Sequence, residues 1–308
     1  MRAAALLALS VLSLACSDPA PSPSVVPFDA AARDVAQESG TSLLDAAADL
    51  ASLDVSDDAP SRVDASAVDV PGADAATTDV ARGRLRVLFV GNSYTYVNDL
   101  PGLVTRMGAA ASRAGVGPEI VTDNVTVGGA TLHNHWDTNT APMRIMAGGW
   151  DAVVLQGQSV EPVLAYADFR TYAVRFGMLA STYGARAVYY ATWPRRAGDD
   201  VYTQSWSGGT PEVLGMRLHT AYTQVAALAG GSVAPVGNAW MAALRGRPSI
   251  ELYASDGSHP SPAGTWLAGC VMYRALVGRA APVETESAVT DVPMADARYL
   301  RELSAMVP

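Results

Sequence analysis

Two short polar segments, far apart in the chain, carry the residue types of a serine nucleophile, its base and a supporting acid. The first is Gly91-Asn92-Ser93-Tyr94-Thr95, after an apolar run, and the second is Asp256-Gly257-Ser258-His259-Pro260. A serine hydroxyl is a weak nucleophile at neutral pH unless a neighbouring base takes its proton, and a nearby carboxylate usually fixes the tautomer of that base. Asp256 and His259 are three residues apart on a glycine-containing loop, so their side chains can meet while the second imidazole nitrogen points toward Ser93.

Ser93 is expected on a turn that joins a buried strand, Leu85 to Val90, to a helix. Such a turn can hold a hydroxyl out of the sheet with backbone N–H groups aimed near it. Taken alone, Gly-x-Ser after a strand is most often only a turn, and the segment from Asp256 to His259 alone is compatible with a surface turn before a helix cap at Ser261. Both segments fall where a strand should end, the side of an open α/β sheet on which ligands bind, and this joint placement favours a catalytic Ser–His pair.

Short apolar strands alternate with helical stretches from Arg84 onward. We expect strands at 85–90, 119–127, 150–155, 187–192 and 232–236, and helices at 100–114, 166–183, 211–229 and 262–277. Strands separated by helices imply a parallel sheet covered on both faces. The predicted fold class is therefore α/β, a three-layer αβα sandwich with a five-stranded parallel sheet. Residues 280–308 are weakly patterned, with a terminal helix expected around Met294 to Met306 packed on the surface.

Four segments resemble, in the right order, the sequence blocks of the SGNH (GDSL-type) hydrolases. They are Gly91-Asn92-Ser93, Val127-Gly128-Gly129-Ala130, Leu155-Gln156-Gly157-Gln158-Ser159 and Asp256 to His259. The resemblance covers roughly Arg84 to Arg279 and implies a flavodoxin-like hydrolase domain at 83–279, followed by a C-terminal extension at 280–308. The first block departs from the Gly-Asp-Ser-Leu wording of the family, and the third carries glutamine where the family usually has asparagine.

The resemblance implies hydrolysis of acyl esters through an acyl-enzyme, with Ser93, His259 and Asp256 as catalytic residues and no metal or organic cofactor. It also implies an oxyanion hole, built from hydrogen-bond donors placed where negative charge develops. The expected donors are the Ser93 N–H, the Gly129 N–H and the Gln158 side chain.

Two of these donor positions have alternatives in the sequence. Gly128 is nearly as well placed as Gly129. Aligning Val153-Val154-Leu155 as the end of the strand puts Gln158, rather than Gln156, at the asparagine position.

Asn92, Trp136 and Trp193 are expected to contact the substrate, because they adjoin the nucleophile, the glycine block and the end of the fourth strand. The family resemblance allows lipids, acetylated sugars and thioesters, and an exported address favours a small-molecule or glycan ester, such as O-acetylated carbohydrate. A non-catalytic carbohydrate-binding module on the same fold is the alternative, although it leaves the combination of Ser93, Asp256 and His259 unexplained.

A second motif, His133-Asn134-His135-Trp136-Asp137, resembles the opening ligand motif of metallo-β-lactamase-type hydrolases. That motif continues with a histidine where this chain has Thr138, and only His219 and His259 remain elsewhere. A metal-dependent hydrolase using His133, His135 and Asp137 is therefore a remote alternative. The favoured interpretation is that these residues start the helix after the glycine block.

The N-terminus predicts export. Residues 1–16 contain Arg2, an apolar run too short for a permanent membrane span, and Ser13-Leu14-Ala15-Cys16, which resembles a bacterial lipobox. The sequence thus predicts lipidation at Cys16 and a membrane-anchored lipoprotein of the cell envelope; an ordinary cleavable signal and a secreted protein are the alternative.

The whole chain of 308 residues has a formal net charge of −9, and residues 17–82 hold thirteen acidic residues but only three arginines. An acidic, aromatic-poor segment of this kind is predicted to be a disordered tether, with a short helix possible at Thr41 to Leu53.

Because the chain has no basic cluster, nucleic-acid binding is disfavoured. Cys270 lies on a helical apolar stripe and is expected in the core. A monomer is expected.

Overall fold

The computed structural model describes residues 83–308. The predicted export signal, the lipidation of Cys16, the acidic segment 17–82 and the helix at Thr41 to Leu53 all lie outside the described residues. Within 83–308, no helix combines the length and the apolar composition needed to cross a bilayer.

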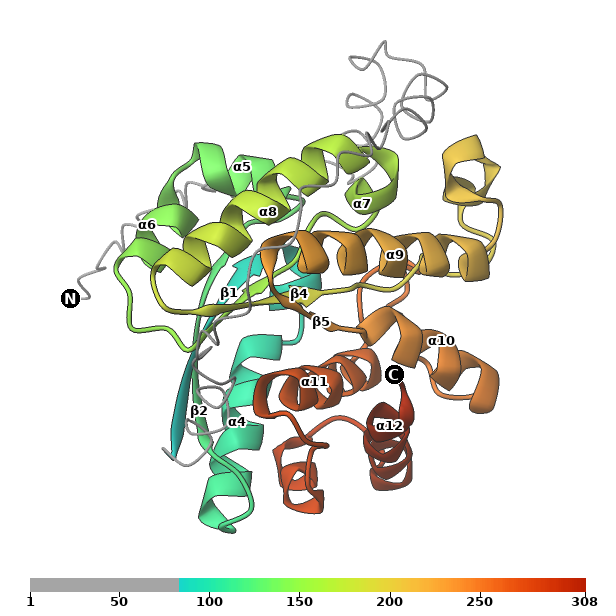
Figure 1. Cartoon of the computed structure of the whole chain (residues 1–308). Helices are drawn as coiled ribbons and strands as arrows, with labels where there is room; N and C mark the ends of the chain where they lie inside the picture. The colour runs from blue at the N-terminus through green and yellow to red at the C-terminus, as the bar shows by residue number, and fades with distance from the viewer. Residues whose placement is uncertain (1–82) are drawn as a thin grey trace, which may run out of the picture. The chain divides into compact units, whose positions relative to one another are not determined.

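Five parallel strands form one sheet, in the order β2-β1-β3-β4-β5. Figure 1 shows this sheet between two layers of helices. The strands are β1 (Arg84–Gly91), β2 (Glu119–Thr126), β3 (Ala152–Leu155), β4 (Arg186–Tyr190) and β5 (Ser232–Ala234). This confirms the predicted α/β class and the five-stranded parallel sheet.

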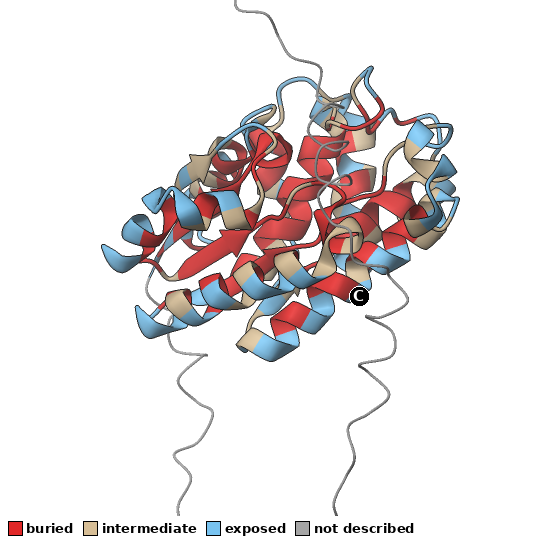
Figure 2. Ribbon diagram, turned by 90° about the horizontal axis from the view of Figure 1, so that it is seen from above, coloured by how far each residue is buried: buried red, intermediate tan, exposed pale blue. Residues whose placement is uncertain are grey.

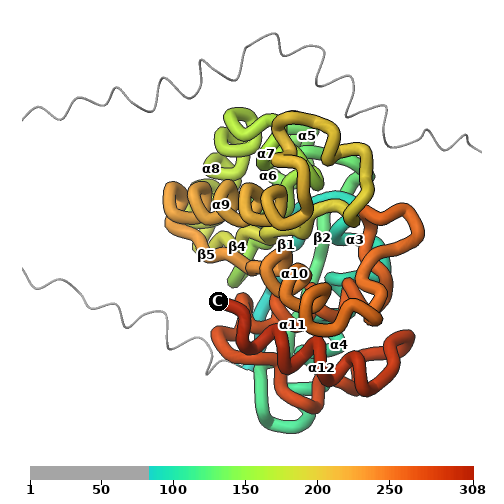
Figure 3. Tube along the Cα trace, turned by 90° about the vertical axis from the view of Figure 1, so that its right-hand side faces the viewer, coloured from blue at the N-terminus to red at the C-terminus, as the bar shows by residue number. Residues whose placement is uncertain are grey.

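Helices cover both faces of the sheet, as the side view in Figure 3 shows. The longer helices are α4 (Leu100–Arg113), α8 (Tyr166–Thr182), α9 (Pro211–Ala229), α10 (Val236–Gly246), α11 (Pro262–Val277) and α12 (Met294–Met306). The shorter elements are α3 (Ser93–Tyr96), α5 (Leu132–Asp137), α6 (Thr140–Met146), α7 (Glu161–Leu164) and the 3₁₀ turns at Asp200–Thr203, Ser205–Ser207 and Val283–Ala288. The predicted helix at 211–229, the one at 262–277 and the terminal one at 294–306 are confirmed to the residue, whereas α10 was not predicted.

The two hydrophobic cores follow the alternation of side chains along the strands. On β1, Val87 and Phe89 enter the core shared with α4, α10, α11 and α12, whereas Leu88 and Val90 enter the core shared with α5, α6, α8 and α9. Successive side chains of a strand point to opposite faces, so a central strand covered on both sides must be apolar at every position. Figure 2 shows the resulting band of buried residues through the middle of the molecule.

The C-terminal residues 280–308 belong to the first of these cores. Ala297 and Leu300 of α12 are fully buried, and the indole N–H of Trp266 on α11 donates to the Ala297 carbonyl at 2.8 Å. Cys270, also on α11, is fully buried, as its apolar stripe predicted. This extension therefore helps to hold α11. That helix follows residues 254–261, the acid–base segment, which contains Asp256 and His259.

The strand register brings the ends of the strands to one edge. Gly91 pairs with Thr126, Val90 with Leu155, and Tyr190 with Ala234. The loops that leave β1, β2, β3 and β4 therefore emerge side by side, at the carboxyl edge where open α/β sheets bind ligands.

Candidate active site

Ser93 lies in the first turn after β1, where the chain changes from strand to helix. It is the first residue of α3, directly after Asn92, which has an extended backbone and accepts a hydrogen bond from the Tyr94 N–H at 3.1 Å. Ser93 itself is 4% exposed. The nucleophile candidate is therefore fixed by a side-chain cap immediately before it.

His259 and Asp256 come to Ser93 from the loop that precedes α11. The His259 Nε2 atom lies 2.8 Å from the Ser93 Oγ atom, and the His259 Nδ1 atom lies 2.5 Å from Oδ2 of Asp256. With the ring proton on Nδ1 and donated to the carboxylate, Nε2 is left to accept the serine proton. The structure thus brings the three predicted residues together in the order that proton transfer requires.

Asp256 is oriented by its own loop. Its Oδ1 atom accepts the backbone N–H groups of Ser258 and His259, each at 2.9 Å. Gly257, between Asp256 and Ser258, has the left-handed backbone of this turn at φ +68°. Burial by itself raises the pKa of the Asp256 carboxyl, but the bonds from the imidazole and from the two N–H groups outweigh burial and lower this pKa below its ordinary value. The carboxyl is therefore ionised at neutral pH and accepts from His259.

The backbone N–H groups of Ser93, Gly128 and Gly129 have no intramolecular acceptor among residues 83–308. The two glycines occupy a tight turn in which the Ala130 N–H donates to the Val127 carbonyl at 3.2 Å, with Gly129 at φ +69°. Unpaired backbone donors beside a serine hydroxyl are what an oxyanion hole requires. Both predicted glycine positions retain a donor, so Gly128 and Gly129 stay alternatives.

The two glutamines of the third block have different surroundings. Gln156 is fully buried, and its Oε1 atom accepts the Asn92 N–H and the Thr95 hydroxyl, each at 2.9 Å. Its Nε2 atom donates to the Asn92 Oδ1 atom at 2.9 Å and to the Gly157 carbonyl. Gln156 thus uses its whole amide to brace the nucleophile turn.

Gln158 anchors only one end of its amide. Its Oε1 atom accepts the N–H groups of Val160 and Glu161 at 3.0 and 3.3 Å, whereas its Nε2 atom has no partner among residues 83–308. An amide held by its oxygen keeps its N–H donors for a substrate, which favours Gln158 over Gln156 as the oxyanion donor.

The structure corrects two of the three expected substrate contacts, Asn92 and Trp193. Asn92 is 2% exposed, and its amide is used by Ala130, Tyr94 and Gln156. Trp193 is 1% exposed and stacks between Tyr94 and Trp240, with ring centroids 4.7 and 4.0 Å away. Both side chains are buried and make their contacts inside the protein, so neither is a substrate contact.

Trp136 serves a helix interface. Its ring meets Phe176 edge to face at 5.2 Å and lies 6.3 Å from Tyr172, while the Arg175 guanidinium lies 5.7 Å above it. All three partners belong to α8, so Trp136 packs α5 against that helix.

The two histidines of the metal motif, His133 and His135, have different partners. His133 is stacked on Tyr172 and lies 3.1 Å from Asp137 and 3.2 Å from Asp168, whereas His135 is buried and its Nε2–H donates to the Gly91 carbonyl at 2.8 Å. Burial lowers the pKa of His135, against the bond to Gly91, so the ring is neutral there. Among residues 83–308, no group of three or more histidine, cysteine or acidic side chains is arranged to hold a metal ion. The remote metal-dependent alternative is therefore rejected for His133, His135 and Asp137.

Comparison with solved structures bears on the family of the chain. A protein from Slackia heliotrinireducens that is assigned to the SGNH hydrolases is 30% identical in sequence, with a TM-score of 0.53 over 62% of this chain and 98% of that one. A DUF4886 family protein from Bacteroides uniformis is 15% identical, with a TM-score of 0.55 over 72% of this chain and 93% of that one. No family model and no curated protein matches the chain. On the first of these likenesses, the chain belongs to the SGNH hydrolases.

Proposed function

We propose that this hydrolase is a serine esterase in which Ser93 is the nucleophile, His259 the general base and acid, and Asp256 the group that orients the imidazole. The observation that carries the proposal is the continuous chain of contacts from the Ser93 Oγ atom through His259 to Asp256. Backbone N–H donors that have no acceptor among the described residues, 83–308, follow the neighbouring strand.

The reaction begins with an ester whose carbonyl carbon lies over Ser93. Attack by Oγ forms the C–O bond while His259 Nε2 takes the hydroxyl proton, and negative charge moves to the carbonyl oxygen. The N–H groups of Ser93 and of Gly129 or Gly128, together with the Gln158 amide, would stabilise that charge, and loss of one such donor typically raises the barrier by about 2.7–4 kcal/mol.

Collapse of the tetrahedral intermediate breaks the bond to the alcohol, which leaves with the proton held on His259. A water molecule then gives a proton to the same nitrogen and attacks the acyl carbon. The bond from that carbon to the Ser93 Oγ atom breaks, and His259 returns the proton to Oγ, which releases the acid and free Ser93. The imidazole alternates between base and acid, which requires Asp256 to hold its tautomer through both steps.

A fluorophosphonate probe tests the nucleophile directly. We expect the full chain to be labelled on Ser93, Ser93→Ala to remain unlabelled, and Ser181→Ala to label like the parent. Ser181 is the matched control because it is an exposed serine on α8, remote in sequence from every block of the site. Absence of labelling in a folded parent protein would favour the carbohydrate-binding alternative.

We propose O-acylated carbohydrate as the substrate class, on the strength of the predicted export. Acetate release from acetylated polysaccharides should then exceed hydrolysis of long-chain p-nitrophenyl esters at equal concentration. A rate that rises steadily with acyl length would point to lipid esters.

We also propose export with lipidation at Cys16, which rests on the sequence of residues 1–16 alone. Mass spectrometry of the native N-terminus tests it: a diacylglyceryl cysteine at position 16 is expected. An unmodified chain that begins downstream of Cys16 would exclude the anchor.

A further inference from the structure

Tyr94, the residue after the candidate nucleophile, is buried between the parts of the site. It is 1% exposed, and its ring lies parallel to that of Trp193, with centroids 4.7 Å apart and an angle of 2° between the planes. The His259 imidazole meets the same ring edge-on at 5.7 Å and 69°. Tyr94 thus contacts the catalytic base from the same short helix that carries Ser93.

The phenol hydroxyl reaches the acid–base segment at its middle. Its oxygen lies 2.7 Å from Ser258 Oγ, and Ser258 is the residue between Gly257 and His259. The backbone N–H of this same serine donates to Asp256. A bond to Ser258 therefore acts on both partners of the proposed proton relay.

Trp193 holds the other polar group of Ser258. The indole N–H donates to the Ser258 carbonyl at 3.0 Å, and the opposite face of the indole stacks on Trp240 at 4.0 Å. The stacked pair Tyr94 and Trp193 therefore holds Ser258 by its side chain and by its main chain.

The phenol stays uncharged in this position. Burial raises the pKa of Tyr94, and the opposing influences of Arg195, Ser258 and Ser159 are smaller. A neutral hydroxyl can both donate and accept, so it can hold Ser258 while meeting a second neighbour. A phenylalanine would keep the ring contacts and lose the hydroxyl, with its bond to Ser258 and its interaction with Ser159.

We propose that Tyr94 is a positioning residue, whose hydroxyl keeps His259 within proton-transfer distance of Ser93 by fixing Ser258. This inference rests on the proposed serine mechanism. Its physical basis is the steep dependence of such steps on geometry, since a displacement of about 1 Å at the reacting groups can cost about 10²-fold in rate. We expect substrate binding not to depend on this bond, because Tyr94 is only 1% exposed.

The test compares Tyr94→Phe with Ser258→Ala and with the double variant, in the full chain, on p-nitrophenyl acetate. We expect each single variant to lower kcat by about 10-fold to 10²-fold, with KM within about twofold of the parent. The double variant should be no worse than the poorer single variant, because both remove the same bond. A proton NMR resonance from the His259 Nδ1–H should shift in Tyr94→Phe.

Tyr189→Phe is the matched control. Tyr189 is also fully buried, and its hydroxyl donates to the Ala173 carbonyl at 2.8 Å, between β4 and α8. Removing this hydroxyl should lower the free energy of unfolding without changing kcat or the imidazole resonance.

The outcomes separate the inference from the proposed function. A Tyr94→Phe protein with parental kcat, or with a loss matched by Tyr189→Phe, would overturn the positioning role while labelling of Ser93 still supports the esterase. If Tyr94→Phe does not fold, Ser258→Ala alone decides, and parental kcat in that variant overturns the inference. Full activity in Ser93→Ala would instead remove the proposed function, and the inference with it.

Discussion

The acid–base segment, residues 254–261, and the glycine turn, residues 127–130, form two sides of the same site and are held very differently. The acid–base segment is fastened by surrounding side chains. In addition to Tyr94 and Trp193, the Asn98 amide donates to the Pro260 carbonyl at 2.9 Å, and the Arg196 guanidinium donates to the Ala254 carbonyl at 3.4 Å.

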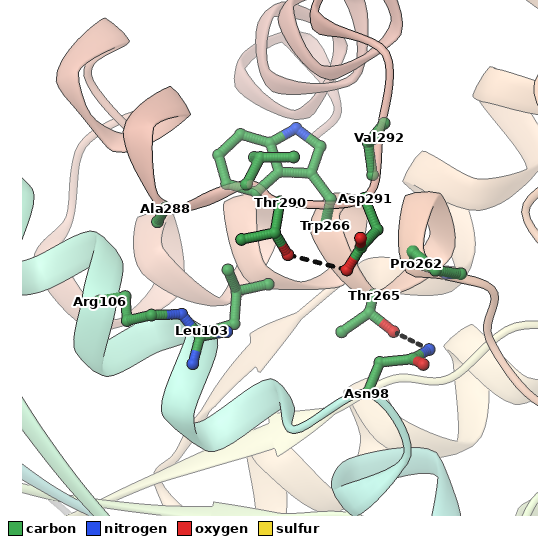
Figure 4. Close-up of a pocket in the computed structure, with 11 residues that line it drawn as sticks. Asn98, Leu103, Arg106, Pro262, Thr265, Trp266, Ala288, Thr290, Asp291 and Val292 are labelled. Atoms are coloured by element: carbon green, nitrogen blue, oxygen red, sulfur yellow. Dashed lines mark hydrogen bonds between the residues drawn. The ribbon is translucent and has the colours of Figure 1, made fainter.

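Asn98 also donates to the Thr265 hydroxyl on α11 at 3.0 Å, as Figure 4 shows. These two residues border a cavity of about 270 Å³ between α4, α11 and residues 288–292. Ser93, Asp256 and His259 are not among the residues that line this cavity. Asn98 thus ties the acid–base segment to the start of the next helix.

The glycine turn, in contrast, is held mainly through its backbone. The Val127 N–H donates to the Gly91 carbonyl at 3.2 Å, and the Ala130 carbonyl accepts the Asn92 amide at 3.0 Å. Val127 is 55% exposed. The N–H groups of Gly128 and Gly129 have no acceptor among residues 83–308, as an oxyanion site requires.

The difference teaches how the two tasks constrain a protein. Proton transfer needs two side chains at a fixed separation, so the loop that carries them is bonded on several sides. Stabilising an oxyanion needs donors without protein partners, so the turn that supplies them must forgo internal bonds at those groups. Four changes test this division, from the largest expected effect to the smallest.

Removing the proton relay should have the largest effect. We expect Ser93→Ala and His259→Ala each to lower kcat by roughly 10⁶-fold, and the double variant to be no worse, because the residues act as one unit. Asp256→Asn should retain more activity, with a loss of about 10⁴-fold. Steady-state kinetics with thermal unfolding as the folding control measures this, and near-parental turnover in Ser93→Ala would refute the nucleophile assignment.

On the oxyanion side, Gln158→Ala should lower kcat by roughly 10²–10³-fold with little change in KM. Gln158→Glu sharpens the test, because a carboxylate keeps the oxygen that caps Val160 and Glu161 but offers no donors. We expect its kcat to be at least as low as that of Gln158→Ala.

Gln156→Ala is the matched comparison, because its amide makes only internal bonds. It should lower the free energy of unfolding by about 1–3 kcal/mol and reduce kcat less than Gln158→Ala does. A larger kcat loss in Gln156→Ala, without a loss of stability, would mean that Gln156 is the oxyanion donor.

The pH dependence of the free energy of unfolding tests Glu161, the first residue of α7, which follows Gln156 and Gln158. Glu161 is 4% exposed, and burial raises its pKa from 4.5 to about 8, although one carboxyl oxygen accepts the Gln158 N–H. Between these values the folded state binds a proton that the unfolded state lacks, so the free energy of unfolding should fall as pH rises, by at most about 1.4 kcal/mol per pH unit. Glu161→Gln should flatten this slope in chemical denaturation from pH 4.5 to 8, and an unchanged slope would contradict the assignment.

The smallest effect is expected from deleting residues 1–82. Every side chain placed in the site lies at or after Asn92, so a chain beginning at Gly83 should hydrolyse small soluble esters with kcat and KM within about twofold of the full chain. A large loss in a folded, truncated protein would show that residues before Gly83 take part in catalysis.

Much of the fold could be predicted from local patterns. The apolar runs gave the strands, and helices such as α9 and α11 carry clear signals at both ends: a Thr210 or Ser261 cap, proline at the first position and glycine after the last. The unpredicted α10 lacks these signals, since Pro235 precedes it and no side chain caps it. Its formation depends on burial of Trp240 and its neighbours against α11, which only the assembled core provides.

For the site, the sequence by itself determined the candidate residues of the relay, because serine, aspartate and histidine chemistry is specific. The expectation that both segments lie where a strand ends is right for Ser93, after β1, and wrong for Asp256 and His259, because α10 separates them from β5. The tertiary structure decided which polar side chains form internal hydrogen bonds that position the other site residues. Asn92, Gln156 and Trp193 read like substrate or oxyanion residues, yet they are buried and fully bonded within the protein. The sequence assigned no role to Tyr94, because the residue that its hydroxyl contacts, Ser258, lies 164 positions further along the chain. Whether a polar group faces the substrate or a protein neighbour depends on which distant loops pack around it. A local sequence pattern does not specify those long-range contacts.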